Sequence, residues 1–338
     1  YKDNKNLIAM LYLESAYNLG INEKEYLEKA IERYQEFAED IRDEETVRFL
    51  YALCLELNGN IEEAEYIYSE LNWKNDTNIA CRYLICKLTR SEYAEVVKIY
   101  AEIDPTVMHT KLRSLYLTAL YYEDKDNYKD HLEEALHDVQ DNLEGIIDIA
   151  FGIHEKAYLC ANVVPLIKQH MSSELDELVF LQKTELLSIL SHAGELELVI
   201  DVLRSIKNIA TLNHYIVREI YDAAFAVSNR DFTNHDKALI KSEKLESAEL
   251  VADLFLEANV SRKEFLQIKY LCAGAKEKRF SMLKYAKELF GITNEEGLAR
   301  NIIAMLFERN EVDFNAYAPY IAVLSNTTKP DYCMAVAS

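Results

Sequence analysis

The chain has 338 residues, half of them hydrophobic, and a formal net charge of −21 at pH 7. It contains only 8 Gly and 4 Pro, far fewer turn residues than a sheet protein of this length needs. The composition therefore excludes an all-β fold. It predicts an almost entirely helical chain, long enough for two domains or one elongated repeat array.

The negative charge is concentrated in the first part of the chain. Residues 1–200 hold 19 Lys+Arg and 39 Asp+Glu, whereas residues 201–338 hold 18 and 19. Phosphates would be repelled by the first part, which disfavours nucleic-acid binding by residues 1–200. Two interpretations of this acidity stay open: it keeps a long helical surface solvated, or it attracts a basic partner.

The cysteine pattern and the hydropathy indicate in which cellular compartment the protein is expected. Six cysteines are scattered without a CxxC pair or a secreted-type framework, so we expect reduced thiols and a cytoplasmic protein. No apolar run reaches the roughly 18–20 residues that span a bilayer, and no signal peptide is present, so we expect no membrane association. Because the sequence opens YKDNKN without Met, we expect a piece of a longer protein.

In chain order, residues 25–40 form the first strongly periodic helical segment. An apolar stripe over 47–55 and another over 61–71 flank a turn at Gly59, which predicts an antiparallel helical hairpin. Asn60 and Glu63 stand three residues apart at the start of the second stripe, the spacing of a capping box.

The second half of this hairpin recurs along the chain. In residues 89–105 the match has an offset of 32, in residues 25–40 an offset of 34, and residues 192–206 repeat the turn at Gly194. The positions Ile61, Ala64, Tyr68 and Leu71 correspond to Tyr93, Val96, Tyr100 and Ile103. A period near 34 with two helices per unit indicates stacked hairpins, since one hairpin cannot bury its apolar face alone.

These repeats resemble the tetratricopeptide repeat. The positions that fit the family pattern are Ala52, Leu55, Gly59, Ala64, Tyr68 and Leu71. The chain departs from it at Arg48, Asp76, Ser91 and His131, which replace the family's usual Trp, Pro, turn Gly and Ala. The resemblance implies an all-α fold, a right-handed α-α superhelix (solenoid) of about 8–9 hairpins and 16–18 helices.

The resemblance also implies a binding surface. In the family, fixed positions of the first helix of each hairpin line a concave groove for a peptide or a partner helix. The matching residues are Thr46, Phe49, Leu53 and Glu56; Asn78, Cys81, Ile85 and Leu88; Arg113, Tyr116, Leu120 and Glu123. From these we take as candidate groove residues Phe49, Leu53, Glu56, Asn78, Ile85, Arg113, Tyr116, Leu120 and Glu123. The alternative is a superhelix that closes on itself, so that these residues meet neighbouring helices.

The remainder of the chain also has helical periodicity. Residues 142–153 and 157–170 form a possible pair with Pro165 near the start of the second helix. Capping boxes are expected at Ser261 with Glu264 and at Thr293 with Glu296. The polar stretch 228–237 marks a boundary. We therefore predict an N-terminal array over 1–228, a second subarray over 229–325, and a tail or linker over 326–338.

The sequence offers no catalytic, cofactor or metal motif. Nucleotide-binding glycine loops and nucleophile motifs are absent, and the His and Asp clusters near residues 124–137 and 154–158 lack metal-ligand spacing. Two other features could serve interactions: the 23 Tyr residues and the basic segment 276–287. Each also has a structural interpretation, as repeat packing and as a solvated helix face.

We therefore expect no enzyme but a protein-interaction scaffold that binds a protein or peptide. Two alternatives stay open: a peptide-sensing regulatory region of a larger bacterial regulator, or an array attached to an enzyme whose effector domain lies elsewhere in the protein.

Overall fold

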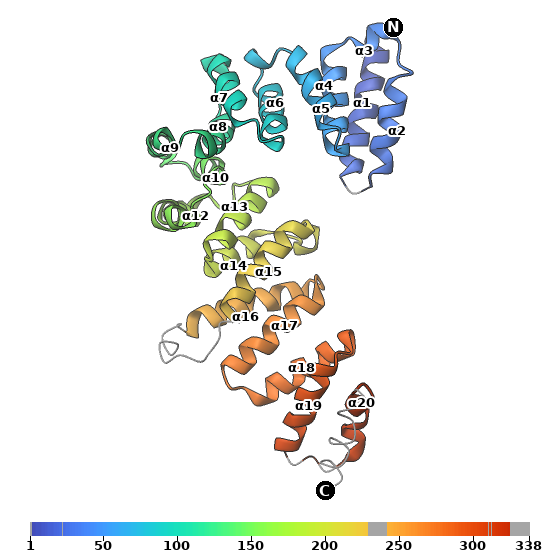
Figure 1. Ribbon diagram of the computed structural model, residues 1–338, viewed down its shortest axis with the longest axis vertical. Coiled ribbons are helices and arrows are strands. Elements are labelled where there is room, and N and C mark those ends of the chain that lie inside the picture. Colours follow the sequence, from blue (N-terminus) through green and yellow to red (C-terminus); the bar gives the residue numbers. More distant parts are fainter. Residues whose placement is uncertain (1, 22, 229–241, 310, 312, 325–338) are drawn as a thin grey trace. The chain divides into compact units, whose positions relative to one another are not determined.

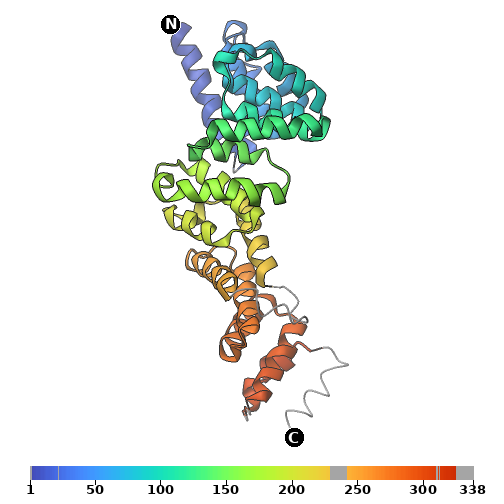
Figure 2. The same ribbon diagram turned by 90° about the vertical axis from the view of Figure 1, so that its left-hand side faces the viewer.

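The protein is all-α. The computed structural model (Figures 1 and 2) describes every residue except 1, 22, 229–241, 310, 312 and 325–338. The described residues form about 19 helices, and no strand occurs among them, which confirms the predicted fold class. The chain divides into two compact units, Tyr1–Leu166 and Ile167–Ser338. The boundary predicted after residue 228 adjoins residues 229–241, which lie outside the described part. The predicted tail, 326–338, also lies outside it.

The first unit consists of consecutive helical hairpins. Its main helices are α1 (Lys2–Gly20), α2 (Glu25–Tyr34), α3 (Glu39–Arg42), α4 (Glu45–Asn58), α5 (Ile61–Glu70), α6 (Thr77–Thr89), α7 (Tyr93–Glu102), α8 (Thr110–Glu123), α9 (Lys125–Val139) and α10 (Leu143–Phe151). Each helix packs on its neighbours in the chain, and alternate helices also meet, since α6 contacts α8 and α8 contacts α10. This pattern is typical of stacked antiparallel hairpins.

The residues identified as repeat positions form the core of this unit. Ala30, Ala64, Tyr68 and Val96 are completely buried, which confirms that these repeat positions belong to the core. The helices α4, α6 and α8 begin at residues 45, 77 and 110, separated by 32 and 33 residues. The period read from the sequence is therefore the period of the helices.

The turns between paired helices use the left-handed conformation. Gly59 and Gly194 have φ angles of 94° and 82°, as a glycine at a helix C-terminus commonly does. Ser91, which replaces the turn glycine between α6 and α7, also adopts a positive φ of 59°. The repeat thus keeps its turn geometry where the sequence has lost its glycine.

The second unit repeats the hairpin arrangement. Its helices are α12 (Val164–Glu174, which begins in the first unit), α13 (Phe180–Ala193), α14 (Leu196–Ser205), α15 (His214–Ser228), α16 (Ser242–Glu257), α17 (Arg262–Ala275), α18 (Arg279–Thr293), α19 (Glu296–Glu308) and α20 (Ala318–Ile321). Here too alternate helices meet: α13 contacts α15, α15 contacts α17, and α14 contacts α16.

The helix pair expected around Pro165 is present, with an irregularity. After α10, the chain forms the short helix α11 (Lys156–Tyr158), a π-helical turn η3 (Leu159–Val163) and then α12. Pro165 is the second residue of α12. Proline has no N–H to donate to the preceding turn. The π-helical turn η3 ends at Val163, two residues before Pro165.

The three predicted capping boxes are wrong in detail. Asn60 is the N-cap residue of α5 but makes no side-chain cap hydrogen bond. Ser261 adopts a left-handed conformation with φ of 43° and also makes none, since a capping side chain normally acts from an extended backbone. Thr293 ends α18, and α19 begins after Glu295. Among the described α-helices of the first unit, the N-cap side chains that do accept helix N–H groups are Glu44, Asp76, His109, Asp124 and Asn142.

Candidate functional site

An open hollow of about 340 Å³ lies between the start of α4 and the segment leading into α6. Its lining residues are Glu45, Thr46, Phe49, Asn72, Asn75, Asp76, Asn78 and Ile79. Three positions to which the resemblance points, Thr46, Phe49 and Asn78, are thus brought together. Thr46 and Asn78 are exposed and Phe49 is half-buried.

Hydrogen bonds fix the polar rim of this hollow. Asp76 Oδ1 accepts the N–H groups of Asn78 at 2.8 Å and Ile79 at 3.1 Å, and so caps α6. Glu45 Oε1 accepts the Asn72 N–H at 3.1 Å, and Asn75 Nδ2 donates to Asn72 Oδ1 at 2.8 Å. The backbone and side chains around the hollow are therefore held in place without a ligand.

The other two candidate residues on α4 have structural contacts. Leu53 is buried in the core of the first unit, so its side chain does not line an open surface. Glu56 Oε2 accepts the hydroxyl of Tyr68 at 2.9 Å, and Glu56 Oε1 lies 3.0 Å from Arg82 Nη1. Burial, and next the charge of Glu56, raise the pKa of Tyr68 far above its usual range. This neutral Tyr joins α5 to α4.

On α6, Ile85 is half-buried, as are Cys81 and Leu88. Burial raises the pKa of the Cys81 thiol to about 11, with the charge of Lys111 opposing the rise. A thiol that stays protonated near neutral pH is a poor nucleophile and a poor metal ligand.

The candidate groove residues on α8 differ in their burial and in their contacts with neighbouring helices. Arg113 pairs with Asp138 at 2.6 Å and Glu134 at 3.5 Å on α9. Tyr116 stacks on Tyr100 with ring centroids 4.2 Å apart. Leu120 is buried, again a correction to its placement on an open groove, and Glu123 is exposed. Side chains of α7 and α9 therefore contact Tyr116 and Arg113, two of the α8 residues that the resemblance assigned to a ligand surface.

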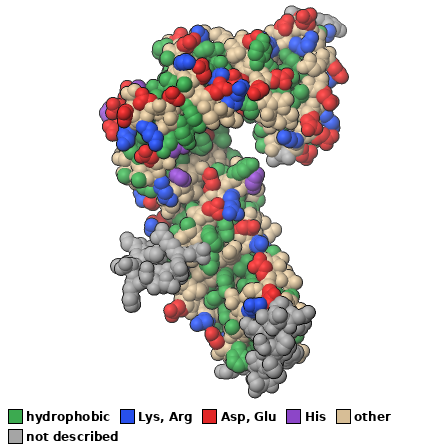
Figure 3. Space-filling model, in the orientation of Figure 1, with side chains coloured by type: hydrophobic (Ala, Val, Ile, Leu, Met, Phe, Trp, Pro, Cys, Tyr) green, Lys and Arg blue, Asp and Glu red, His purple; other side chains and the backbone are tan. Residues whose placement is uncertain are grey.

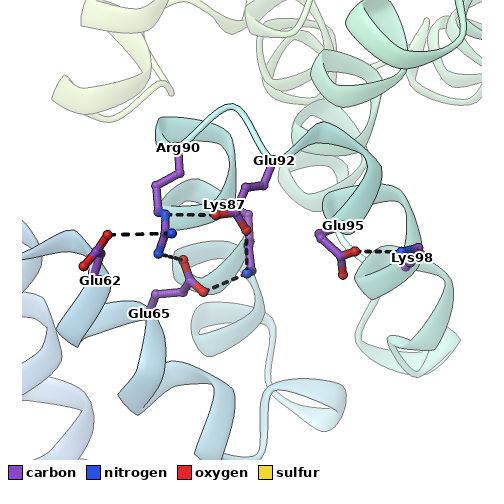
Figure 4. A network of polar contacts seen from close by, with 7 residues as sticks. All are labelled: Glu62, Glu65, Lys87, Arg90, Glu92, Glu95 and Lys98. Carbon is purple, nitrogen blue, oxygen red and sulfur yellow. Dashed lines mark hydrogen bonds and ion pairs between the residues drawn. The ribbon is translucent and has the colours of Figure 1, made fainter.

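An ion network that the sequence did not reveal joins α5 to the α6–α7 turn (Figure 4). Lys87 Nζ lies 2.7 Å from both Glu65 and Glu92, and Arg90 contacts the same two carboxylates at 3.2 and 2.9 Å. Burial lowers the pKa of Lys87, but its hydrogen bonds with Glu65 and Glu92 outweigh this and raise it. Glu65 lies 22 residues from Lys87 and 25 from Arg90 in the sequence, so the network becomes apparent only once the hairpins are stacked.

A buried carboxylate joins α8 to α10. Asp148 is 9% exposed and accepts the hydroxyl of Thr110, while His109 Nδ1 lies 3.9 Å away. That nitrogen also accepts the Lys111 N–H at 3.3 Å as the cap of α8. The sequence signal was a single carboxylate inside the apolar run IIDIAF, residues 146–151.

The basic segment 276–287 contacts acidic side chains of its own unit. Lys276 pairs with Glu249 at 2.7 Å and Arg279 with Glu308 at 3.0 Å, whereas Lys278, Lys284 and Lys287 are exposed. Part of this segment therefore holds neighbouring helices together.

Across the described residues, no group of three or more His, Cys, Asp or Glu side chains is arranged to hold a metal ion. None of the described helices has both the length and the apolar character to cross a bilayer.

The surface of the first unit is acidic. Residues 1–166 hold 17 Lys+Arg and 33 Asp+Glu, a net charge of −16. On the face of this unit that Figure 3 shows, acidic side chains are spread out rather than gathered in one patch.

No protein-family model matches the chain, and no curated protein matches it. The chain is accordingly described by its own architecture, an all-α protein of helical-repeat character.

Proposed function

We propose that the first unit is a non-enzymatic protein-binding array that holds an extended, basic peptide segment across the hollow at α4 and α6. The unit's repeats resemble tetratricopeptide repeats, and the observation that carries the proposal is the hollow itself. It contains Thr46, Phe49 and Asn78, which occupy the positions that bind ligands in that family.

The chemistry of the hollow suits a main chain. A carboxamide can both donate and accept hydrogen bonds, so Asn78 can pair with the N–H and C=O groups of an extended segment. Phe49 offers an apolar face for a side chain of the partner. Because the rim is fixed by its own hydrogen bonds, binding there would cost little ordering of the protein.

The charge argues for a basic partner. A unit with a net charge of −16 attracts cationic segments and repels anionic ones over roughly a Debye length. Glu45 and Asp76 stand in the lining itself.

The cysteines support a reducing compartment such as the cytoplasm. Cys54, Cys81, Cys86 and Cys272 are free thiols, and all of these except Cys81 are buried. Thiols of this kind are typical of proteins that do not meet an oxidising environment.

The proposal is tested by probing the whole chain against an arrayed library of short peptides of random sequence. We expect basic peptides to be enriched. Their binding should weaken as salt rises from about 0.05 to about 0.5 M, where the Debye length falls from roughly 14 to 4 Å. The variant Asn78→Arg should lose at least about tenfold in affinity, because it fills the hollow and places like charge against the ligand.

The matched control is Thr89→Arg, which adds the same charge at an exposed position near the other end of the same helix. Selection of no peptide above background would contradict the protein-binding proposal. Equal loss in both variants, or none in Asn78→Arg, would place the peptide outside the hollow.

A further inference from the structure

Lys183 on α13 is a buried lysine, and its ammonium group pairs with no carboxylate of the described residues. Its residue is 8% exposed, and its Nζ makes one long hydrogen bond, 3.5 Å, to the carbonyl of Ser205. Among the residues that the structure describes, no carboxylate lies within 4.0 Å of this Nζ. Removing an ammonium group from water is costly unless an opposite charge or several acceptors compensate it.

The same unit shows how this protein stabilises another buried lysine. Lys269 is 5% exposed, and its Nζ lies 2.8 Å from Asp253 and 3.2 Å from Glu249. Two carboxylates thus lie beside the ammonium of Lys269, whereas no carboxylate in the described part of the chain comes within 4.0 Å of the Lys183 ammonium.

Lys183 lines an open hollow of about 280 Å³. The lining residues are Leu178, Phe180, Lys183, Ser205, Ile206, Lys207, Asn208 and Thr211. Two of these are lysines and none is acidic, in a chain whose net charge is −21. One part of the lining is therefore cationic and another apolar.

The polar groups beside Lys183 can complete an anion site. Lys207 is exposed, and Asn208 uses its Oδ1 to accept the Ala210 N–H at 3.1 Å, which leaves its amide N–H groups to donate. Leu178, Phe180 and Ile206 would accept the apolar part of a ligand.

We propose that this hollow binds a carboxylate carried on a short apolar group, with Lys183 as its ionic partner. The carboxylate of a free aliphatic acid and the C-terminal carboxylate of a peptide ending in an apolar residue share this chemistry. Inorganic phosphate does not, because it has no apolar part to cover Leu178 and Phe180. The site is separate from the peptide surface proposed for the first unit and does not depend on it.

The test is calorimetric titration of the full chain with four probes: N-acetyl-leucine, its neutral amide N-acetyl-leucinamide, octanoate and inorganic phosphate. We expect N-acetyl-leucine or octanoate to bind and the amide and phosphate not to bind. Tighter binding of N-acetyl-leucine would identify a peptide C-terminus as the ligand, and tighter binding of octanoate would identify a free acid.

Two variants test the role of the charge. Lys183→Met keeps the length of the side chain and removes the ammonium, and should weaken the acid at least about tenfold. Lys207→Glu places a carboxylate at the rim, at an exposed position whose replacement leaves the core intact, and should weaken it similarly. Lys287→Met and Lys287→Glu make the same changes at an exposed lysine on α18 and should bind as the unaltered chain does.

Several results would overturn the proposal. These are no heat from either acid, equal affinity for the amide or for phosphate, and unchanged affinity in a folded Lys183→Met. If Lys183→Met loses its helical circular dichroism, Lys207→Glu decides, and unchanged affinity in that variant refutes the site.

Discussion

The hydroxyl of Tyr68 donates a 2.9 Å hydrogen bond to Glu56 Oε2 across the α4–α5 hairpin. Tyr68 is completely buried, and Glu56 also pairs with Arg82 on α6 at 3.0 Å. One repeat tyrosine therefore fills the crossing between two helices and, through Glu56, links them to the next hairpin.

We expect Tyr68→Phe to lower the free energy of unfolding by about 1 kcal/mol, since it removes a buried hydrogen bond to a charged acceptor and keeps the ring. The measurement is urea denaturation of the full chain. Tyr66→Phe is the control, because Tyr66 also donates to a glutamate, Glu70 at 2.6 Å, but is 63% exposed. It should leave the midpoint of urea denaturation unchanged within the error of the measurement. Equal effects would mean that the buried bond contributes nothing beyond the exposed one.

The turn at Ser91 offers a stabilising change. Ser91 has a φ of 59°, a conformation that costs a residue with a Cβ roughly 1 kcal/mol, whereas glycine adopts it freely. We expect Ser91→Gly to raise the free energy of unfolding by a few tenths to about 1 kcal/mol, offset in part by the greater freedom of glycine in the unfolded chain.

The reciprocal change is its control. Gly59 has a φ of 94°, and a Cβ there would meet no atom within 4 Å, so Gly59→Ser should destabilise through the backbone alone. Thermal unfolding of both variants tests the pair. A loss of stability in Ser91→Gly would show that the serine side chain contributes more than its backbone conformation costs.

The sequence predicted the features that depend on neighbours within one hairpin. Burial of Ala64 and Tyr68 and the left-handed turns at Gly59 and Gly194 follow from periodicity and turn chemistry over about 30 residues. The shared repeat pattern also placed Thr46, Phe49 and Asn78 at one surface, because α4 and α6 are equivalent helices.

Features that depend on how hairpins stack could not be predicted. Leu53 and Leu120 occupy positions that line the groove in the family, yet both are buried here. Arg82 meets Glu56 from 26 residues away, a contact fixed by the stacking register rather than by local pattern. In the sequence, Lys183 cannot be distinguished from an exposed lysine of an amphipathic helix. Its burial depends on how α13 packs with the segment 205–211, which lines the same hollow.

Small residues at the helix crossings set how closely the helices approach. Ala64 is completely buried where α5 enters its hairpin, so Ala64→Leu must displace neighbouring side chains. We expect a loss of about 1–3 kcal/mol, measured by urea denaturation. Ala94→Leu, at an exposed position of α7, adds the same atoms without a clash and should stay within about 0.5 kcal/mol. A folded Ala64→Leu of unchanged stability would show that the crossing has room for the larger side chain.

Because the thiol of Cys54 is buried, we expect the protein to lose stability in alkaline solution. Burial raises the pKa of Cys54 from 9.0 to about 12, and its Sγ lies 3.6 Å from the carbonyl of Leu13, to which the protonated thiol donates. A group whose pKa is higher in the folded protein favours folding while both states are protonated. This contribution to the free energy of unfolding is fully present below pH 9. It declines above that pH, because the thiol ionises in the unfolded chain but stays protonated in the folded protein. Between about pH 9.5 and 11 the free energy of unfolding should therefore fall by about 1.4 kcal/mol per pH unit from this group alone.

Comparison of variants separates the contribution of Cys54 to the pH dependence of stability from that of the tyrosines and lysines that titrate in the same range. Cys54→Ala should flatten the decline by about that amount, since it removes one proton from the linkage. Val47→Ala, at a completely buried position of the same helix, lowers stability by opening a cavity but removes no titrating group, so its slope should match that of the unaltered chain. Urea denaturation at a series of pH values measures both slopes. Identical slopes for Cys54→Ala and the unaltered chain would mean that the thiol ionises equally readily in the folded and unfolded states, which its burial beneath α1 argues against.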